Sequence, residues 1–312
     1  MPYPREAVEA VKAKVLQEAA MMREMNKILP VSGVRYELPA KGRTISMVYY
    51  QAPKANAPLC LGFHGGGFLF GGSAMNDAMW SAVAKELCVN VASIEYRKSP
   101  QFQYMDAVLD AWEAAMYLKG HAEEFGHSSV MYTMGCSAGA NIAAAVCLYG
   151  KQQGEMPFAG QLLMYPFLDA DTDPMLKGKG SLEGPIMQVF NELHCLPKET
   201  RNPLVSPVFA DRELLTNQPP AIFVLAEVDN LKVEGEHYAK KLTEAGVKVE
   251  LMVSEDMPHG FFESGFGKIS EEEMNFLGED VKQKVRSGEV HEKSVKALEF
   301  IKEKMGSMPG QG

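Results

Sequence analysis

Short apolar runs alternate with segments of helical spacing from about residue 58 onward. The runs contain few polar residues, which is typical of strands whose two faces are both buried. In chain order they are PLCLGF, VNVASIEY, SVMYTMG, GQLLMYPFL, AIFVLAEV and KVELMVS. Such strands, separated by helices, predict an α/β fold: a mainly parallel central sheet with helices on both faces.

The first fifty residues follow a different pattern. Residues 1–30 carry apolar side chains at helical spacing and end at Pro30, which predicts an amphipathic helix that must cover another part of the protein. The sequences GVRYELPA and RTISMVYYQA then read as two strands, and Lys41 and Gly42 between them suit a hairpin.

Two segments interrupt the alternation of strands and helices. Residues 170–217 are rich in Asp, Pro, Gly and Met, which indicates an insertion above the sheet, and residues 265–288 form a second, Glu- and Lys-rich insertion. A final amphipathic helix is predicted next, and the tail 306–312 is predicted to be disordered. The length and composition suit one large buried core, so we expect a single domain over residues 1–312, and no internal repeat occurs. The apolar positions of the final helix are Val295, Leu298, Ile301 and Met305.

Composition narrows the class of protein. The chain has 312 residues, 46% of them hydrophobic, and a formal net charge of −9, so it lacks the basic surface that binds nucleic acid or an anionic membrane. Its five cysteines are an odd number without a C-x-x-C spacing, which argues against a disulfide framework and a zinc site. Residues 1–30 lack the apolar core of a secretory signal, and no run is long enough to span a bilayer. We therefore expect a cytoplasmic protein.

The sequence VMYTMGCSAGANIAAAV places Ser137 between two glycines where a predicted strand meets a predicted helix. A nucleophilic serine occupies such a tight turn, and small residues such as Gly135 and Gly139 let the backbone fold back on itself. The helix N-terminus favours negative charge, so the N–H of Ala138 is a candidate donor to an oxyanion. The alternative is that Ser137 only caps the helix, but a strand before it and a helix after it favour the nucleophile.

A second motif is LGFHGGGFLFGG, directly after the third predicted strand. Consecutive glycines let backbone N–H groups approach a developing oxyanion, and Gly66 and Gly67 are the candidate donors. A flexible loop or a phosphate cradle are the alternatives, but no Gly-Lys-Ser/Thr follows to support a phosphate-binding loop. We interpret His64 as a structural turn residue, because it precedes the glycines.

An activated serine needs a base and a carboxylate that orients this base. His259 directly follows a predicted strand, and Asp229 lies at the end of the strand before it, which gives the chain order nucleophile, acid, base. Surface positions are expected for the other downstream histidines, His194, His237 and His291. The competing acids close to His259 are Glu255 and Asp256, which lie off the expected strand end.

Together, HGGGF, GCSAG, EVDNLKVEGEHYAKKLTEAGV and HGF resemble the hormone-sensitive-lipase-like family of α/β-hydrolase carboxylesterases, over most of residues 31–262 and the last helix. The resemblance implies an α/β-hydrolase fold with a helical cap, built from about residues 1–30 and part of 170–217. It implies a small-molecule ester substrate and no cofactor, and it leaves a homodimer open. The implied triad is Ser137, Asp229 and His259, and the implied oxyanion hole is formed by Gly66, Gly67 and Ala138.

The chain departs from the family pattern at three places. Cys136 stands where the family usually has Asp, Asn230 where it usually has Pro, and the sequence YRKSPQ ends in Gln101 instead of a carboxylate. These changes bear on the pH profile and on local rigidity, not on the reaction class. Cys136 is either an inert buried thiol or a source of thiol-sensitive activity. The insertion 265–288 lies outside the pattern, and it either extends the cap or contacts another subunit.

We therefore expect a serine carboxylesterase that hydrolyses small, short-chain acyl esters through an acyl-serine intermediate. Deacetylation of a carbohydrate or another small molecule, amide hydrolysis and lactone hydrolysis use the same serine chemistry, and the sequence does not separate them. The alternative of another class is a non-catalytic protein that binds a small ligand on the same fold.

Overall fold

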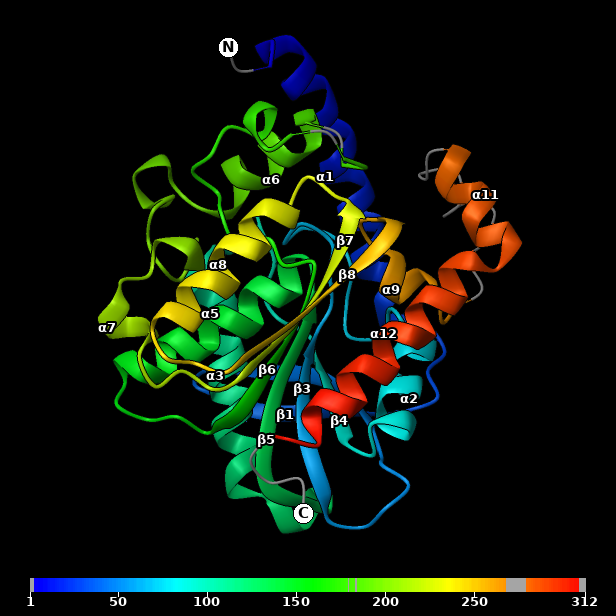
Figure 1. Cartoon of the computed structure of the whole chain (residues 1–312), viewed down its shortest axis with the longest axis vertical. Coiled ribbons are helices and arrows are strands. Elements are labelled where there is room, and N and C mark those ends of the chain that lie inside the picture. Colours follow the sequence, from blue (N-terminus) through cyan, green and yellow to red (C-terminus); the bar gives the residue numbers. More distant parts are fainter. Residues whose placement is uncertain (1–2, 179, 183, 268–278, 309–312) are drawn as a thin grey trace.

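The structure is a computed structural model, and it describes residues 3–178, 180–182, 184–267 and 279–308. Eight strands form one sheet in the order β1-β2-β4-β3-β5-β6-β7-β8 (Figure 1). β2 pairs antiparallel with β1 and β4, and all other neighbours pair parallel. The mainly parallel sheet expected from the apolar runs is confirmed. The strands are β1 (Val34–Ala40), β2 (Arg43–Tyr50), β3 (Ala57–Phe63), β4 (Asn90–Ile94), β5 (His127–Cys136), β6 (Phe158–Met164), β7 (Ala221–Val228) and β8 (Val249–Pro258).

Helices cover both faces of the sheet (Figure 1). The helices α3, α5 and α8 pack on one face, and α2 and α12 pack on the other. The helices are α1 (Arg5–Ile28), α2 (Asp77–Glu86), α3 (Tyr104–Gly120), α4 (Ala122–Phe125), α5 (Ala138–Gln152), α6 (Gly184–His194), α7 (Arg212–Leu215), α8 (Lys232–Glu244), α9 (Phe261–Ser264), α11 (Glu279–Ser287) and α12 (Glu289–Met305). Short 3-10 turns lie at Pro174–Leu176, Pro197–Glu199 and Pro207–Phe209.

The two helical layers explain why the strands are apolar at successive positions. In β7, Phe223 and Leu225 join the core under α5 and α8, while Ile222 and Val224 join the core under α12. All four side chains are fully buried. Because successive side chains of a strand point to opposite faces, a sheet covered on both sides needs apolar residues at every position.

The N-terminal helix α1 packs against α6 beyond the carboxyl ends of the parallel strands (Figure 1). Its apolar stripe is buried at Val8, Val15 and Ala19, as its helical spacing predicts. The helix is also held by a polar contact that the spacing does not reveal. The buried side chain of Asn26 donates to the Glu95 carboxylate (2.7 Å) and accepts from the backbone N–H of Ala74 (3.0 Å).

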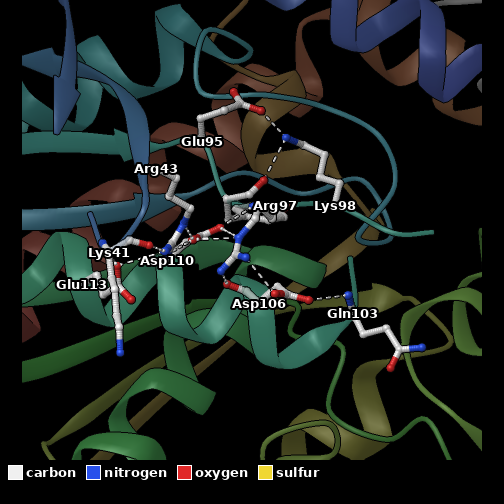
Figure 2. Close-up of polar contacts among 10 residues, drawn as sticks. Lys41, Arg43, Glu95, Arg97, Lys98, Gln103, Asp106, Asp110 and Glu113 are labelled. Carbon is white, nitrogen blue, oxygen red and sulfur yellow. Dashed lines mark hydrogen bonds and ion pairs between the residues drawn. The ribbon is translucent and has the colours of Figure 1, made fainter. Parts of the chain in front are cut away.

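A buried carboxylate holds the segment after β4 to α3 and to the β1–β2 hairpin (Figure 2). Asp110 of α3 is 1% exposed and accepts hydrogen bonds from the backbone N–H of Arg97 (2.8 Å) and from its Nε (2.9 Å). The guanidinium group of Arg43, in β2, also binds Asp110 and reaches Glu113. Paired charge-assisted bonds of this kind fix geometry as well as charge, so Asp110 ties three segments together.

Two expectations for the C-terminal part are modified. The tail is ordered through residue 308, because the apolar side chain of Met308 is 6% exposed and lies against Gly160 of β6. The prediction of disorder was therefore wrong for residues 306–308, and residues 309–312 lie outside the described residues. In the second insertion, residues 279–287 form α11, whereas residues 268–278 also lie outside the described part. Among the described helices, none combines the length and apolar content that crossing a membrane requires.

Candidate active site

Ser137 is the single residue between the end of β5 and the start of α5. Its backbone has φ 55° and ψ −119°, a conformation that L-residues rarely adopt. Its N–H donates to the carbonyl of Met164 (2.9 Å), and its carbonyl accepts from the N–H of Phe167 (3.3 Å), so the adjacent end of β6 supports the turn. Such a strained, supported turn at a strand-to-helix junction is the geometry of a nucleophile elbow.

The glycines on either side of Ser137 are required by close backbone packing. A Cβ atom on Gly135 would lie 2.2 Å from the carbonyl carbon of Gly139. A Cβ atom on Gly139 would lie 2.0 Å from the carbonyl oxygen of Phe63. Neither position has room for a methyl group, because the atoms in contact are backbone atoms that cannot rotate away.

The structure brings Ser137, His259 and Asp229 together in one hydrogen-bonded chain. The Oγ atom of Ser137 lies 2.8 Å from Nε2 of His259, and Nδ1 of His259 lies 2.8 Å from Oδ2 of Asp229. The three residues follow the carboxyl ends of β5, β7 and β8, which meet at one edge of the parallel sheet. The Asp229 side chain is fully buried, whereas Glu255 and Asp256 are exposed.

The other downstream histidines have two different environments. His237 and His291 are exposed, as expected. The expected surface position of His194 was wrong: its side chain is 2% exposed and stacks on the ring of Phe68 with a centroid distance of 3.5 Å. His194 ends α6, which packs onto the loop after β3, and burial lowers the pKa of His194 to about 3. The ring is therefore neutral and belongs to the apolar contact between the α6 region and this loop.

The loop after β3 carries the glycines of the HGGGF motif. Gly66 has φ 115° and Gly67 has φ 57°, and in the described part of the chain their N–H groups make no hydrogen bond. A Cβ atom on Gly67 would lie 2.4 Å from the Phe190 ring of α6, so this ring covers the glycine closely. The loop therefore presents unpaired backbone donors beside the serine turn, where the first N–H of α5 belongs to Ala138.

His64 anchors the start of this loop. Its ring is 1% exposed and stacks on Tyr96 with a centroid distance of 4.3 Å. The Tyr96 hydroxyl donates to the carbonyl of His64 (2.8 Å). Burial, together with the nearby Lys98 charge, lowers the pKa of His64 to about 3. The structure thus places His64 as a neutral supporting residue, in line with its interpretation as a turn residue.

Three contacts that sequence reasoning missed connect Gly178, Ser181 and Leu182 to the loops of Asp229 and His259. The buried side chain of Asn230 accepts from the N–H of Leu182 (3.0 Å) and donates to the carbonyl of Gly178 (3.0 Å). The hydroxyl of Ser181 accepts from the backbone N–H of His259 (2.9 Å). In the sequence, this connection is indicated by Asn230, which directly follows the candidate acid at a position where the family usually has Pro.

Cys136 is fully buried directly before Ser137, and burial raises the pKa of its thiol well above the usual value. The adjacent Glu263 carboxyl group raises this pKa further. A protonated, buried thiol is a poor nucleophile, which favours the inert role over thiol-sensitive activity. All five cysteines are free, and no group of His, Cys, Asp and Glu side chains in the described residues is arranged to hold a metal ion.

Comparison with known proteins places the chain in a family. Residues 60–263 match a family described as alpha/beta hydrolase fold. An arylesterase of Saccharolobus solfataricus is 32% identical over 68% of this chain and 69% of its own, and an ethyl acetate hydrolase of Pseudomonas putida is 29% identical over 72% and 73%. The crystal structure of a Pyrobaculum calidifontis esterase superposes with a TM-score of 0.71 at 27% identity, covering 93% of this chain and 94% of that one. The chain therefore belongs to the hormone-sensitive-lipase-like family of carboxylesterases with the α/β-hydrolase fold.

Proposed function

We propose that this protein is a serine carboxylesterase that hydrolyses small, short-chain acyl esters through an acyl-serine intermediate. Its family makes it a carboxylic ester hydrolase, and the names of its relatives support ester hydrolysis. The observation that carries the proposal is the hydrogen-bonded chain from Ser137 through His259 to Asp229, with both distances at 2.8 Å. This chain has the geometry that activates a serine hydroxyl.

The first half of the reaction forms the acyl-serine. Asp229 holds Nδ1–H of His259, so that Nε2 faces the Ser137 hydroxyl and accepts its proton as Oγ attacks the ester carbonyl. The negative charge that develops on the carbonyl oxygen is stabilised by backbone N–H groups, for which we propose Gly66, Gly67 and Ala138. The alcohol then leaves with the proton from His259.

The second half releases the acid. Water in the position of the departed alcohol loses a proton to Nε2 of His259 and attacks the acyl carbon. The same three N–H groups stabilise the second oxyanion, and the bond to Oγ breaks as Ser137 regains its proton. This sequence of steps needs no cofactor.

The Phe190 ring supports the small-substrate part of the proposal. It lies directly over Gly67 and contacts Phe70 edge-to-face, with a centroid distance of 6.0 Å. An aromatic ring in this position fills the space on the Cβ side of Gly67, so an acyl or alcohol group that extends there would have to displace it. We therefore expect compact substituents to react fastest.

A series of p-nitrophenyl esters tests the proposed function. With acyl groups from acetate to long chains, we expect kcat/KM to be highest for the short members and to fall by about tenfold or more for the long ones. Purified folded protein that hydrolyses none of the esters would contradict the ester-hydrolase proposal. A maximum at long chains would contradict only the proposed substrate size.

Gly67→Ala is expected to lower kcat by about 100-fold or more, because the new methyl group would overlap the Phe190 ring, so that either the ring or the proposed donor has to shift. The same substitution also strains the backbone at φ 57°. Steady-state kinetics with p-nitrophenyl acetate measures the loss.

The matched control is Gly42→Ala, in the turn between β1 and β2. Gly42 also has a positive φ, 73°, but no atom lies within 4 Å of a Cβ atom added there. This variant therefore carries the backbone strain without the collision, and we expect its kcat to stay close to that of the wild type. Equal kcat values for the two variants would argue against Gly67 as a donor.

A further inference from the structure

A buried carboxyl group lies behind the proposed active site and takes no part in the mechanism above. Glu263 belongs to the short helix α9, which follows His259 by one residue, Gly260. Its Oε2 atom is buried and has no hydrogen-bond partner in the part of the chain that the structure describes. A buried carboxyl oxygen without a hydrogen-bond partner lowers the stability of the folded protein. A side chain that carries this cost beside the proposed active site is a candidate for a functional role.

Three segments of the proposed site meet at the Glu263 carboxyl group. It lies beside the Cys136 thiol, at the start of the serine turn, close enough to raise the pKa of that thiol. It also lies against Gly65 of the loop after β3, because a Cβ atom added to Gly65 would be 3.4 Å from Oε1. That same Cβ atom would be 3.6 Å from the Cβ of Ser137. The carboxyl group therefore fills the space between the serine turn, the glycine loop and the helix after His259.

We propose that Glu263 is a positioning residue for the reaction: its carboxyl group, which lies against Gly65, sets the spacing between the glycine loop at Gly65 and the turn that carries Ser137. The inference rests on the proposed ester hydrolysis. Its physical basis is that the oxyanion donors and the nucleophile must be held within a fraction of an ångström of each other. A side chain that touches both segments is suited to hold that spacing.

The charge of Glu263 also bears on the reaction. Burial raises the pKa of Glu263 to about 7, and the backbone of Glu263 itself and the nearby Cys136 side chain partly oppose this rise. Cys136 is the titratable side chain whose contact shifts the pKa of Glu263. The adjacent helix α12 brings the exposed His291 to the carbonyl of Gly265 (2.7 Å) and carries Glu289, Glu292, Lys293 and Lys296. Ionisation places a negative charge beside the loop where the oxyanion forms, so the protonated carboxyl group is the active form. The rate should therefore fall as the pH rises through the pKa of Glu263.

The pH dependence of kcat for the wild type and Glu263→Gln tests this role. With p-nitrophenyl acetate between about pH 5.5 and 9, and with acetate quantified by chromatography, we expect the wild-type kcat to contain a step near pH 7 that lowers the rate about tenfold. The amide keeps the shape of the protonated carboxyl group and cannot ionise. Glu263→Gln should therefore lack the step and should stay within about threefold of the wild type below it.

A second comparison addresses the contact with the thiol. The Cys136 side chain lowers the pKa of Glu263, so Cys136→Ala should move the step to higher pH. The matched control is Glu234→Gln in α8. Glu234 is another buried carboxyl group whose pKa burial raises to about 7, but it binds Lys177 and the N–H of Leu168. The step should persist in this variant.

The spacing role is tested by Glu263→Ala, which should lower kcat about tenfold at acidic pH with little change in KM, while Glu263→Gln restores the rate. Superimposable pH profiles for the wild type and Glu263→Gln would overturn the inference and leave the proposed function intact. A folded wild-type protein that hydrolyses no ester would overturn both. The Glu263→Gln profile decides the matter even if the alanine variant does not fold.

Discussion

Ser137→Ala is expected to lower kcat/KM for p-nitrophenyl acetate by about 10⁴-fold or more and to leave the fold intact. The variant loses the proposed nucleophile, while the unpaired N–H groups of Gly66 and Gly67 remain. The Ser137 side chain caps no helix by a hydrogen bond, so its removal costs no cap contact. Steady-state kinetics gives the rate, and far-ultraviolet circular dichroism checks the fold.

Covalent labelling provides an independent readout of the same residue. A fluorophosphonate should add one phosphonyl group to the Ser137 peptide of the wild type, detected by mass spectrometry, and none to Ser137→Ala. The matched control is Ser287→Ala, at the exposed end of α11, which should retain both turnover and labelling. Near-normal turnover by folded Ser137→Ala would contradict the nucleophile assignment.

Asp110→Ala is expected to lower the free energy of unfolding by about 3 kcal/mol or more. Asp110 is 1% exposed and pairs with Arg43 and Arg97, whose side chains are only 22% exposed (Figure 2). Removing the carboxylate leaves two partly buried guanidinium groups without their shared partner, and it also frees the backbone N–H of Arg97. Urea denaturation followed by circular dichroism measures the difference.

Asp171→Ala serves as the comparison for Asp110→Ala. Asp171 pairs with Arg201, whose side chain is 67% exposed, and solvent screening limits the contribution of such a pair to less than about 1 kcal/mol. A loss for Asp110→Ala no larger than that for Asp171→Ala would show that burial of the Asp110 network adds nothing to stability.

The departures from the family pattern have structural counterparts in this chain. Asn230 uses both ends of its amide to hold Gly178 and Leu182, a connection that a proline ring cannot make. Gln101 accepts from Arg23 of α1 (2.6 Å), so its uncharged side chain still links this helix to the segment after β4. Cys136 is matched by the Glu263 carboxyl group beside it. Each change thus occurs together with a contact that suits the new residue.

Much of the fold could be predicted from the local pattern of apolar and polar residues. The continuous apolar runs predicted the strands, because a sheet covered on both faces leaves no polar side to any strand. The glycines of the serine turn could also be predicted from local sequence. A side chain at either position would collide with backbone atoms that lie a few residues away or on the adjacent strand. Their positions at the ends of predicted strands, in the expected chain order, selected Asp229 and His259, which the structure brings to Ser137.

Contacts between distant segments were decided only by the tertiary structure. His194 and Met308 are buried although their local sequences resemble surface segments, because α6 packs on the glycine loop and the chain end packs on β6. In the sequence, Glu263 looks like an ordinary helical glutamate. Only the structure shows that its carboxyl group is buried beside Cys136, at the serine turn. Local patterns report which face of an element is apolar, but the partner of a polar side chain depends on where the chain folds back, and that geometry is not encoded within any single segment.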